Sequence, residues 1–180
     1  VSYKMASNML VEDADTIGKG VGKQAALEVQ RLFDTNEAYL KIAAKSDAMV
    51  HGDREAKIRA LQDVKQNTEV FSNLAYTDVN GIGFDSDGND LDRSSRAYLP
   101  QVVQSGKTIV SEPVISDVTG KVVSVIAVPV IENGVVTGVV GGSIGLSRFD
   151  ETLSKMATYR TGQLVVMDET GLVIIHPNEP

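Results

Sequence analysis

The sequence predicts an α+β fold, in which a five- or six-stranded antiparallel sheet is flanked by short helices and preceded by a long N-terminal helix. Two patterns predict this fold. Residues 1–47 contain no proline and carry apolar side chains three or four residues apart, which is the spacing of one helix face. From Val70 onward the chain changes to short β-rich runs separated by turn sequences, the pattern of an antiparallel sheet.

The composition restricts the classes of function. The chain has 180 residues, and its 17 basic and 24 acidic side chains give a net charge of −7. We therefore expect no nucleic-acid partner, because an acidic chain without a basic cluster repels phosphate. The absence of cysteine excludes disulfides, thiolate metal sites and cysteine nucleophiles. The longest apolar run, residues 122–131, is shorter than the roughly 20 residues that cross a bilayer.

The N-terminal helix has its clearest apolar stripe between Gly22 and Leu40. Glycines interrupt the pattern before Leu40, and each costs up to about 1 kcal/mol relative to alanine within a helix, so we expect the first twenty residues to fray or bend. After a break at His51-Gly52-Asp53, a second helix is expected with Asp53 as its N-cap. If the chain forms a homodimer, we expect the N-terminal helix to make the contact.

The sheet is expected to begin at Val70. Strands are predicted at residues 70–77, 82–84, 108–111, 121–131 and 135–146. Asn133-Gly134 between two β-branched runs is a strong hairpin signal, so the last two strands should be central neighbours. One short helix is predicted at residues 98–104, ended by Gly106, and another at residues 147–157.

After residue 158 the chain begins a new pattern, with strands at residues 164–167 and 172–175 around a turn at 168–171. Two short strands do not make a stable sheet by themselves. We therefore interpret residues 159–180 as the start of a second, incomplete module. The preceding chain is divided into an N-terminal helix, residues 1–47, and a module that contains the main sheet, residues 48–158.

Residues 92–98, with the sequence Asp-Arg-Ser-Ser-Arg-Ala-Tyr, are the most informative segment for function. They place two guanidinium groups, two hydroxyls and a phenol in a loop that leads into a short helix. Guanidinium groups form paired hydrogen bonds with carboxylates, so this loop is suited to binding a small anion. Alternatively, Arg93 and Arg96 only neutralise five nearby aspartates, at positions 78, 85, 87, 90 and 92. The local residues leave both interpretations open.

The other motifs support neither metal binding nor catalysis. Asp85-x-Asp87-x-Asn89 alternates oxygen ligands as a calcium loop does, but Asp90 and Arg96 stand where an EF-hand needs glycine and glutamate. We interpret the segment as a solvated acidic turn and expect no metal and no cofactor. The two histidines, at positions 51 and 176, lie near no nucleophile elbow, so we expect no catalytic residue and no enzyme.

Taken in order, these motifs resemble the distal module of the double Cache family, the extracytoplasmic PAS-like sensors of bacterial and archaeal receptors. The matching segments are residues 85–98, 110–116, 119–121, 127–130 and 136–146, and the tail, residues 161–177, resembles the opening of the proximal module. The resemblance covers about residues 10–180. It implies a membrane-anchored receptor whose extracytoplasmic, membrane-distal Cache module binds a small molecule. Its long helices would pass the signal to a chemotaxis, histidine kinase or cyclic-dinucleotide output domain.

The resemblance also implies where the ligand binds. Amino-acid-binding members carry an Arg-x-Trp-aromatic run, a later Pro-Tyr-x-Asp and a final Gly-Gly-Asp, which correspond here to residues 96–99, 113–116 and 141–143. Arg96, which would hold a carboxylate, is kept, whereas Ser143 replaces the acid that would neutralise an ammonium. A buried ammonium without a counter-ion loses hydration that it cannot recover, so an α-amino acid is disfavoured.

We therefore expect a small organic anion or neutral polar metabolite held by Arg96 and Tyr98. The hydrogen-bond partners are expected among Ser95, Ser116, Ser143 and Tyr76. Two other classes of function stay open. One is a dimerisation or interaction module whose cavity is filled by side chains. The other is a small acid–base enzyme that uses the aspartate-rich loop, for which turnover lost in Asp87→Asn would be evidence.

Overall fold

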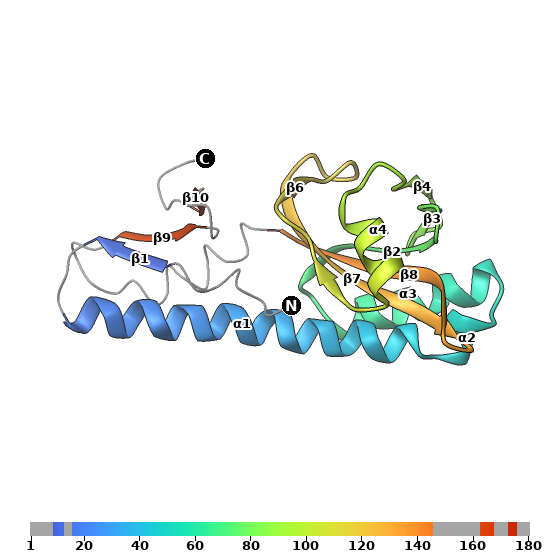
Figure 1. The fold of residues 1–180 in the computed structure, drawn as a ribbon, viewed down its shortest axis with the longest axis horizontal. Helices are drawn as coiled ribbons and strands as arrows, with labels where there is room; N and C mark the ends of the chain where they lie inside the picture. Colours follow the sequence, from blue (N-terminus) through green and yellow to red (C-terminus); the bar gives the residue numbers. More distant parts are fainter. Residues whose placement is uncertain (1–8, 13–15, 146–162, 168–172, 176–180) are drawn as a thin grey trace. The chain divides into compact units, whose positions relative to one another are not determined.

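The computed structural model describes residues 9–12, 16–145, 163–167 and 173–175 of the chain (Figure 1). These residues belong to two compact units, one of which comprises Thr35–Gly145, with the remaining described residues in the other. The helix predicted at residues 147–157 and the turn predicted at 168–171 lie outside the described residues. The module boundaries at residues 47 and 158 stay predictions.

The smaller unit contains a three-stranded antiparallel sheet. Its strands are β1 (Met9–Glu12), β9 (Gln163–Met167) and β10 (Val173–Ile175), in the order β1-β9-β10. The predicted pairing of the two C-terminal strands is confirmed. β1 differs from the expectation of a fraying helix start, because Met9–Glu12 is extended against β9. A strand whose partner lies near the other end of the chain leaves no local signal in the sequence.

Three helices precede the main sheet. α1 (Thr16–Ala44) contains the predicted apolar stripe and continues through the glycines that were expected to disturb it. α2 (Asp47–Val50) is a single turn, and α3 (Arg54–Asn67) follows it. The carboxylate of Asp53 accepts the backbone N–H of Ala56 at 2.8 Å, which confirms Asp53 as the N-cap of α3. Within the described ranges, no helix combines the length and apolar character needed to span a bilayer.

The main sheet has seven antiparallel strands in the order β4-β3-β2-β8-β7-β5, with β6 also paired to β7. The strands are β2 (Phe71–Asp78), β3 (Ile82–Asp85), β4 (Asp90–Asp92), β5 (Ile109–Val110), β6 (Val114–Ile115), β7 (Val122–Glu132) and β8 (Val135–Gly145). The α+β fold with its antiparallel sheet is confirmed. The count of five or six strands was too low, because β4 and β6 are too short for their own sequence to predict them.

The turn chemistry of the larger unit agrees with the sequence. β7 and β8 are joined at Asn133-Gly134, where φ is 50° and 82°, as a tight hairpin requires. α4 (Tyr98–Ser105) ends at Gly106, which has a left-handed φ of 61°. The two long strands are therefore central, and α4 is placed directly after the arginine-containing loop.

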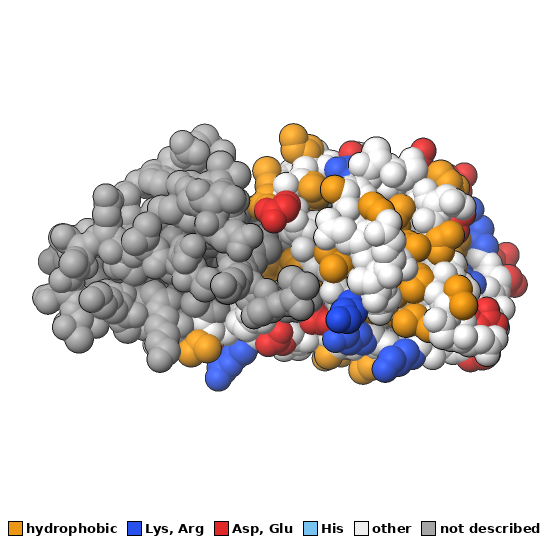
Figure 2. Space-filling view, viewed as in Figure 1, with side chains coloured by type: hydrophobic (Ala, Val, Ile, Leu, Met, Phe, Trp, Pro, Cys, Tyr) orange, Lys and Arg blue, Asp and Glu red, His pale blue; other side chains and the backbone are white. Residues whose placement is uncertain are grey.

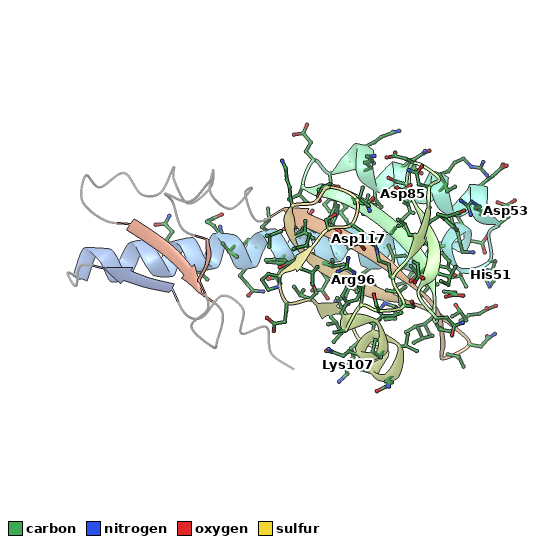
Figure 3. All side chains as sticks on the ribbon, turned by 90° about the horizontal axis from the view of Figure 1, so that it is seen from above. His51, Asp53, Asp85, Arg96, Lys107 and Asp117 are labelled. Atoms are coloured by element: carbon green, nitrogen blue, oxygen red, sulfur yellow. The ribbon has the colours of Figure 1, made fainter. Side chains whose placement is uncertain are left out.

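The two faces of the main sheet carry different helices (Figures 1 and 3). On one face, α4 packs over odd-numbered residues of β7 and β8. This cluster consists of Tyr98, Leu99, Val102, Val123, Val125, Ala127 and Val139. On the other face, a Cβ added at Gly142 would meet Phe71 and Leu40, so this face is covered by α1, and α3 lies over β2 and β3. We refer to the first as the α4 face and to the second as the α1–α3 face.

Candidate functional site

The arginine loop, residues 92–97, is built on the turn between β2 and β3. The backbone N–H of Arg93 donates to the carbonyl of Gly81 at 2.7 Å. Gly81 has φ 91°, and a Cβ there would collide with the backbone of Arg93 and Ser94 and with Leu99. Only glycine combines this conformation with such close approach. The loop is therefore held in place by a neighbouring hairpin turn before α4 begins.

Both guanidinium groups of the arginine loop are largely buried and reach the same carboxylate. The side chains of Arg93 and Arg96 are 12% and 19% exposed, and each forms an ion pair with Asp117. Arg96 also donates from Nη2 to the carbonyl of Ile115 at 3.1 Å. Figure 3 shows Arg96 and Asp117 side by side near the middle of the unit. The arginine pair is thus a convergent donor site with an internal carboxylate in it.

Asp117 was not predicted as a site residue. The ion pairs of Arg93 and Arg96 go to Asp117 and not to the five aspartates of the alternative interpretation. Of those five, Asp92 has its pKa lowered, by hydrogen bonds from Ser94 and also by the charge of Arg93. A hydrogen bond from Arg96, with the charges of Arg96 and Arg93, lowers the pKa of the Asp117 carboxyl below its usual value. Asp117 lies in the turn between β6 and β7. No local pattern could have revealed the pairing, because the turn and the arginine loop are separated by α4, β5 and β6.

Ser116 shapes the turn that carries Asp117. Its Oγ accepts the backbone N–H groups of Val118 at 3.3 Å and Thr119 at 3.2 Å. Its own N–H donates to the carbonyl of Lys121 at 2.9 Å, and its side chain is buried. Because the hydroxyl oxygen already accepts two hydrogen bonds, Ser116 positions the turn and has its hydrogen left to donate.

Tyr98 is the first residue of α4 and is buried in the apolar cluster of the α4 face. Burial raises the pKa of its phenol, against the opposing effect of Arg93 and Arg96. The structure therefore brings Tyr98 to the same region as Arg96. Ser95 lies on the same loop and is exposed.

Ser143 lies on the α4 face of β8. It is in register with Val125 of β7 on one side and with Asn73 of β2 on the other, and paired residues share a face. Val125 belongs to the cluster under α4, so Ser143 faces the same side as Tyr98. Asn73 is buried there as well. Asn73 is a polar residue of this face that the sequence interpretation missed, although alternation along β2 could have indicated it.

Tyr76 lies on the α1–α3 face. Its ring centroid is 5.6 Å from that of Phe84, and Lys57 Nζ lies 5.2 Å from the ring centroid. A Cβ added at Gly138 would meet the Tyr76 ring. The structure therefore does not bring Tyr76 to the arginine loop, because the sheet separates it from Tyr98 and Ser143.

The aspartate-rich segment at residues 85–89 is held by its own hydrogen bonds. Asp85 is buried, and its carboxylate accepts the backbone N–H groups of Asp87 and Asn89 at 2.9 Å and the side-chain amide of Asn89 at 3.0 Å. Burial by itself would raise the pKa of Asp85, but these hydrogen bonds and the charge of Lys65 lower it. The expectation of a solvated turn is corrected for Asp85 and holds for exposed Asp87.

Residues of the described part of the chain do not form a group of three or more histidine, cysteine, aspartate or glutamate side chains suited to a metal ion. His51 is engaged by Asp47 and Glu132, away from the arginine loop, as the labels in Figure 3 show. A hollow of about 440 Å³ in the larger unit is lined by residues of α1, β7 and the turn after α4, and none of the six predicted site residues lines it.

Comparison with known proteins identifies one family model and several solved structures. The model of the Cache domain matches residues 3–180. The ligand-binding domain of the Pseudomonas aeruginosa amino acid chemoreceptor PctC, in complex with GABA, superposes with a TM-score of 0.77 and 19% identity, over 92% of this chain and 77% of that one. Comparison with curated protein sequences found no match.

Two further structures are similar. The extracellular ligand-binding receptor of Desulfohalobium retbaense gives a TM-score of 0.79 at 17% identity, over 92% of this chain and 32% of the receptor. The sensory domain of the Campylobacter jejuni chemoreceptor Tlp3 with isoleucine bound gives 0.68 at 16% identity, over 88% of this chain and 69% of that one. At these identities the similarity shows the fold, and this chain spans about a third of the Desulfohalobium receptor.

Proposed function

Because the chain belongs to the Cache domain family, we propose that it is the extracytoplasmic sensor domain of a transmembrane signalling receptor, such as a chemotaxis transducer, a histidine kinase or a diguanylate cyclase. The chemoreceptor domains that share its fold support this class. The receptor would be anchored in the membrane by parts of the protein other than the described helices. Its role is binding rather than catalysis.

The proposed ligand is a small organic anion or a polar metabolite, bound on the α4 face beside the arginine loop. The observation that carries this proposal is the convergence of Arg93 and Arg96, both largely buried, on the single carboxylate of Asp117. Paired guanidinium donors fit a carboxylate. We interpret the Asp117 carboxylate as occupying the place that a ligand carboxylate takes when bound.

Exchange of Asp117 for a ligand is feasible because Asp117 is 57% exposed and lies on a turn. A ligand carboxylate that takes its place keeps both largely buried guanidinium groups paired, so the exchange avoids the cost of leaving a buried charge without a partner. A charge-assisted hydrogen bond to a ligand contributes about 1.5–3 kcal/mol, while a micromolar complex needs about 8 kcal/mol in all. Tyr98, Ser143 and Asn73 are the groups from which the remaining contacts are expected.

An α-amino acid fits this site poorly, although relatives bind amino acids such as isoleucine and GABA. An ammonium group would need an acid on the α4 face. Ser143 stands where the motif of amino-acid-binding Cache members has an acid, and Asp85 is already satisfied by Asn89 and backbone donors. The remaining acid of the site, Asp117, is engaged by both arginines, so a ligand ammonium would have to compete with Arg93 and Arg96 for its counter-ion.

Calorimetric titration of a metabolite panel tests the proposal. A panel of small carboxylates, with neutral and zwitterionic analogues of the same shape, is titrated into the wild type and Arg96→Ala. We expect at least one carboxylate to bind, with affinity at least tenfold weaker in Arg96→Ala. The matched control is Arg59→Ala, on the exposed surface of α3, which should bind as the wild type does. Unchanged affinity in Arg96→Ala would remove Arg96 from the site.

We also propose that a homodimer, where one forms, uses α1. This helix exposes two large apolar residues, Tyr39 and Ile42, whose exposed fractions are 41% and 71%. Sedimentation of the wild type and of Ile42→Glu distinguishes the cases. A dimer that persists in Ile42→Glu would place the contact on another surface.

A further inference from the structure

A groove on the larger unit combines three lysines with an apolar floor. It lies between the last turns of α1 and the part of β7 that follows its pairing with β5. Its volume is about 440 Å³. α1 contributes Lys41 and Lys45, and the turn after α4 contributes Lys107. We call this region the lysine groove. It shares no residue with the arginine loop.

The charge of the lysine groove contrasts with that of the chain. Its lining carries three lysines and one acid, Glu37, in a protein whose net charge is −7. Lys41 Nζ lies 2.5 Å from Glu37 Oε1, so this lysine is already paired. Lys45 and Lys107 are exposed and form no ion pair with any residue in the described ranges. Two ammonium groups at the rim are therefore available to an anion.

The floor of the lysine groove is apolar. It is made by Val128, Pro129 and Ile131 of β7 and by Ala44 of α1. Val128 and Ala44 are buried, and Pro129 has no N–H to offer a polar ligand. Figure 2 shows basic side chains beside apolar ones over the C-terminal half of α1, and Figure 3 shows Lys107 beside the end of α4.

These two properties select a class of ligand. An inorganic anion would gain from the lysines alone and leave the apolar floor in contact with water. A neutral apolar molecule would gain from the floor and leave the lysines without a partner. A molecule that joins an anionic group to an apolar body uses both. Such an occupant would touch α1 and the sheet at once.

We propose that the lysine groove is a second binding site, which takes an organic anion with an aromatic or branched apolar body, carboxylate or sulfonate, independently of Arg96. Lys45 and Lys107 contact the anionic group, and Val128, Pro129 and Ile131 contact the apolar body.

The test uses 1-anilinonaphthalene-8-sulfonate, whose fluorescence rises on binding, titrated into the complete 180-residue chain. The double variant Lys45→Glu with Lys107→Glu should bind the dye at least tenfold more weakly. The milder double variant Lys45→Gln with Lys107→Gln should change affinity in the same direction. The charge-matched control is Arg59→Glu with Lys65→Glu on α3, which should bind within twofold of the wild type.

Competition separates the apolar and electrostatic contributions. Naphthalene-2-sulfonate should displace the dye, and sulfate at the same concentration should not. The proposal is overturned if Lys45→Glu with Lys107→Glu and the charge-matched control lose affinity for the dye equally, since the effect would then reflect net charge. Equal displacement by sulfate would also overturn it. Arg96→Ala should keep dye binding, so a failure at this groove is distinguishable from a failure at the arginine loop.

Discussion

Arg96 forms an ion pair with Asp117, and so links the loop before α4 to the turn between β6 and β7. Arg93 reaches the same carboxylate. This internal carboxylate satisfies two largely buried guanidinium groups when no other anion is present. The same contact that stabilises the unoccupied site therefore competes with an anionic ligand for it.

Replacing Asp117 by asparagine should increase affinity for a carboxylate ligand. The variant removes the competing charge while keeping the size of the side chain. If the ligand no longer has to displace an ion pair worth about 1 kcal/mol, its affinity should rise about fivefold. Titration of the strongest-binding carboxylate into wild type and variant measures it. Asp63→Asn, on exposed α3, is the control and should leave affinity unchanged. Weaker binding in Asp117→Asn would mean that Asp117 itself contacts the ligand.

The ion pair should also make stability depend on pH in the acid range. The folded-state pKa of Asp117 is lowered, by the hydrogen bond from Arg96 first and then by the arginine charges. Its contribution is therefore fully present above the unfolded pKa of about 3.9 and is lost as pH falls through the folded pKa. Because Asp117 is 57% exposed, we expect no more than about 1 kcal/mol.

Urea unfolding of wild type and Asp117→Asn between pH 3 and pH 7 measures this contribution. The difference in free energy of unfolding between the two proteins should be constant above about pH 5 and should shrink below about pH 4. A difference that stays the same down to pH 3 would show that the carboxylate is not stabilised by the arginines.

Two substitutions of Tyr98 should distinguish a role in packing from a role in ligand binding. Tyr98→Ala removes a ring from the cluster under α4 and should lower the free energy of unfolding by about 3–5 kcal/mol. Tyr98→Phe keeps the ring and should keep the stability within about 1 kcal/mol. If the phenol donates to the ligand, Tyr98→Phe should still bind severalfold more weakly. Equal affinity of Tyr98→Phe and wild type would restrict Tyr98 to packing.

Gly141 and Gly142 form a matched pair, since adjacent residues of β8 point to opposite faces. A Cβ at Gly142 would collide with the ring of Phe71, so Gly142→Ala should destabilise the protein by about 1–3 kcal/mol. A Cβ at Gly141 meets only Val125 Cγ1, at 3.6 Å. Gly141→Ala should therefore fold normally and, because it adds a methyl group to the α4 face, should weaken ligand binding. Thermal unfolding and titration of both variants check the two expectations.

The features that the sequence predicted well depend on local chemistry. Asn133-Gly134 predicted the central hairpin, Asp53 predicted the start of α3, and Gly106 predicted the end of α4. Each of these residues acts on backbone groups within a few positions of itself. Local sequence is sufficient for such features, because the same few residues provide both the signal and the structure.

The features that the sequence missed depend on long-range pairing. The strands β4 and β6 exist because longer neighbours pair with them, and Asp117 meets Arg96 only through the complete fold. Tyr76 and Ser143 were grouped in one site, yet the register of β2 with β8 places Ser143 beside Asn73 and Tyr76 beside Val140, on opposite faces. Register between strands distant in sequence cannot be read from either strand alone.

The most direct test of the account is a crystal structure of the chain with the strongest-binding carboxylate of the panel. The account predicts a ligand oxygen within hydrogen-bond distance of the Arg96 guanidinium, on the α4 face, with the Asp117 carboxylate displaced from it. A ligand bound elsewhere with the Arg96–Asp117 pair intact would contradict the account.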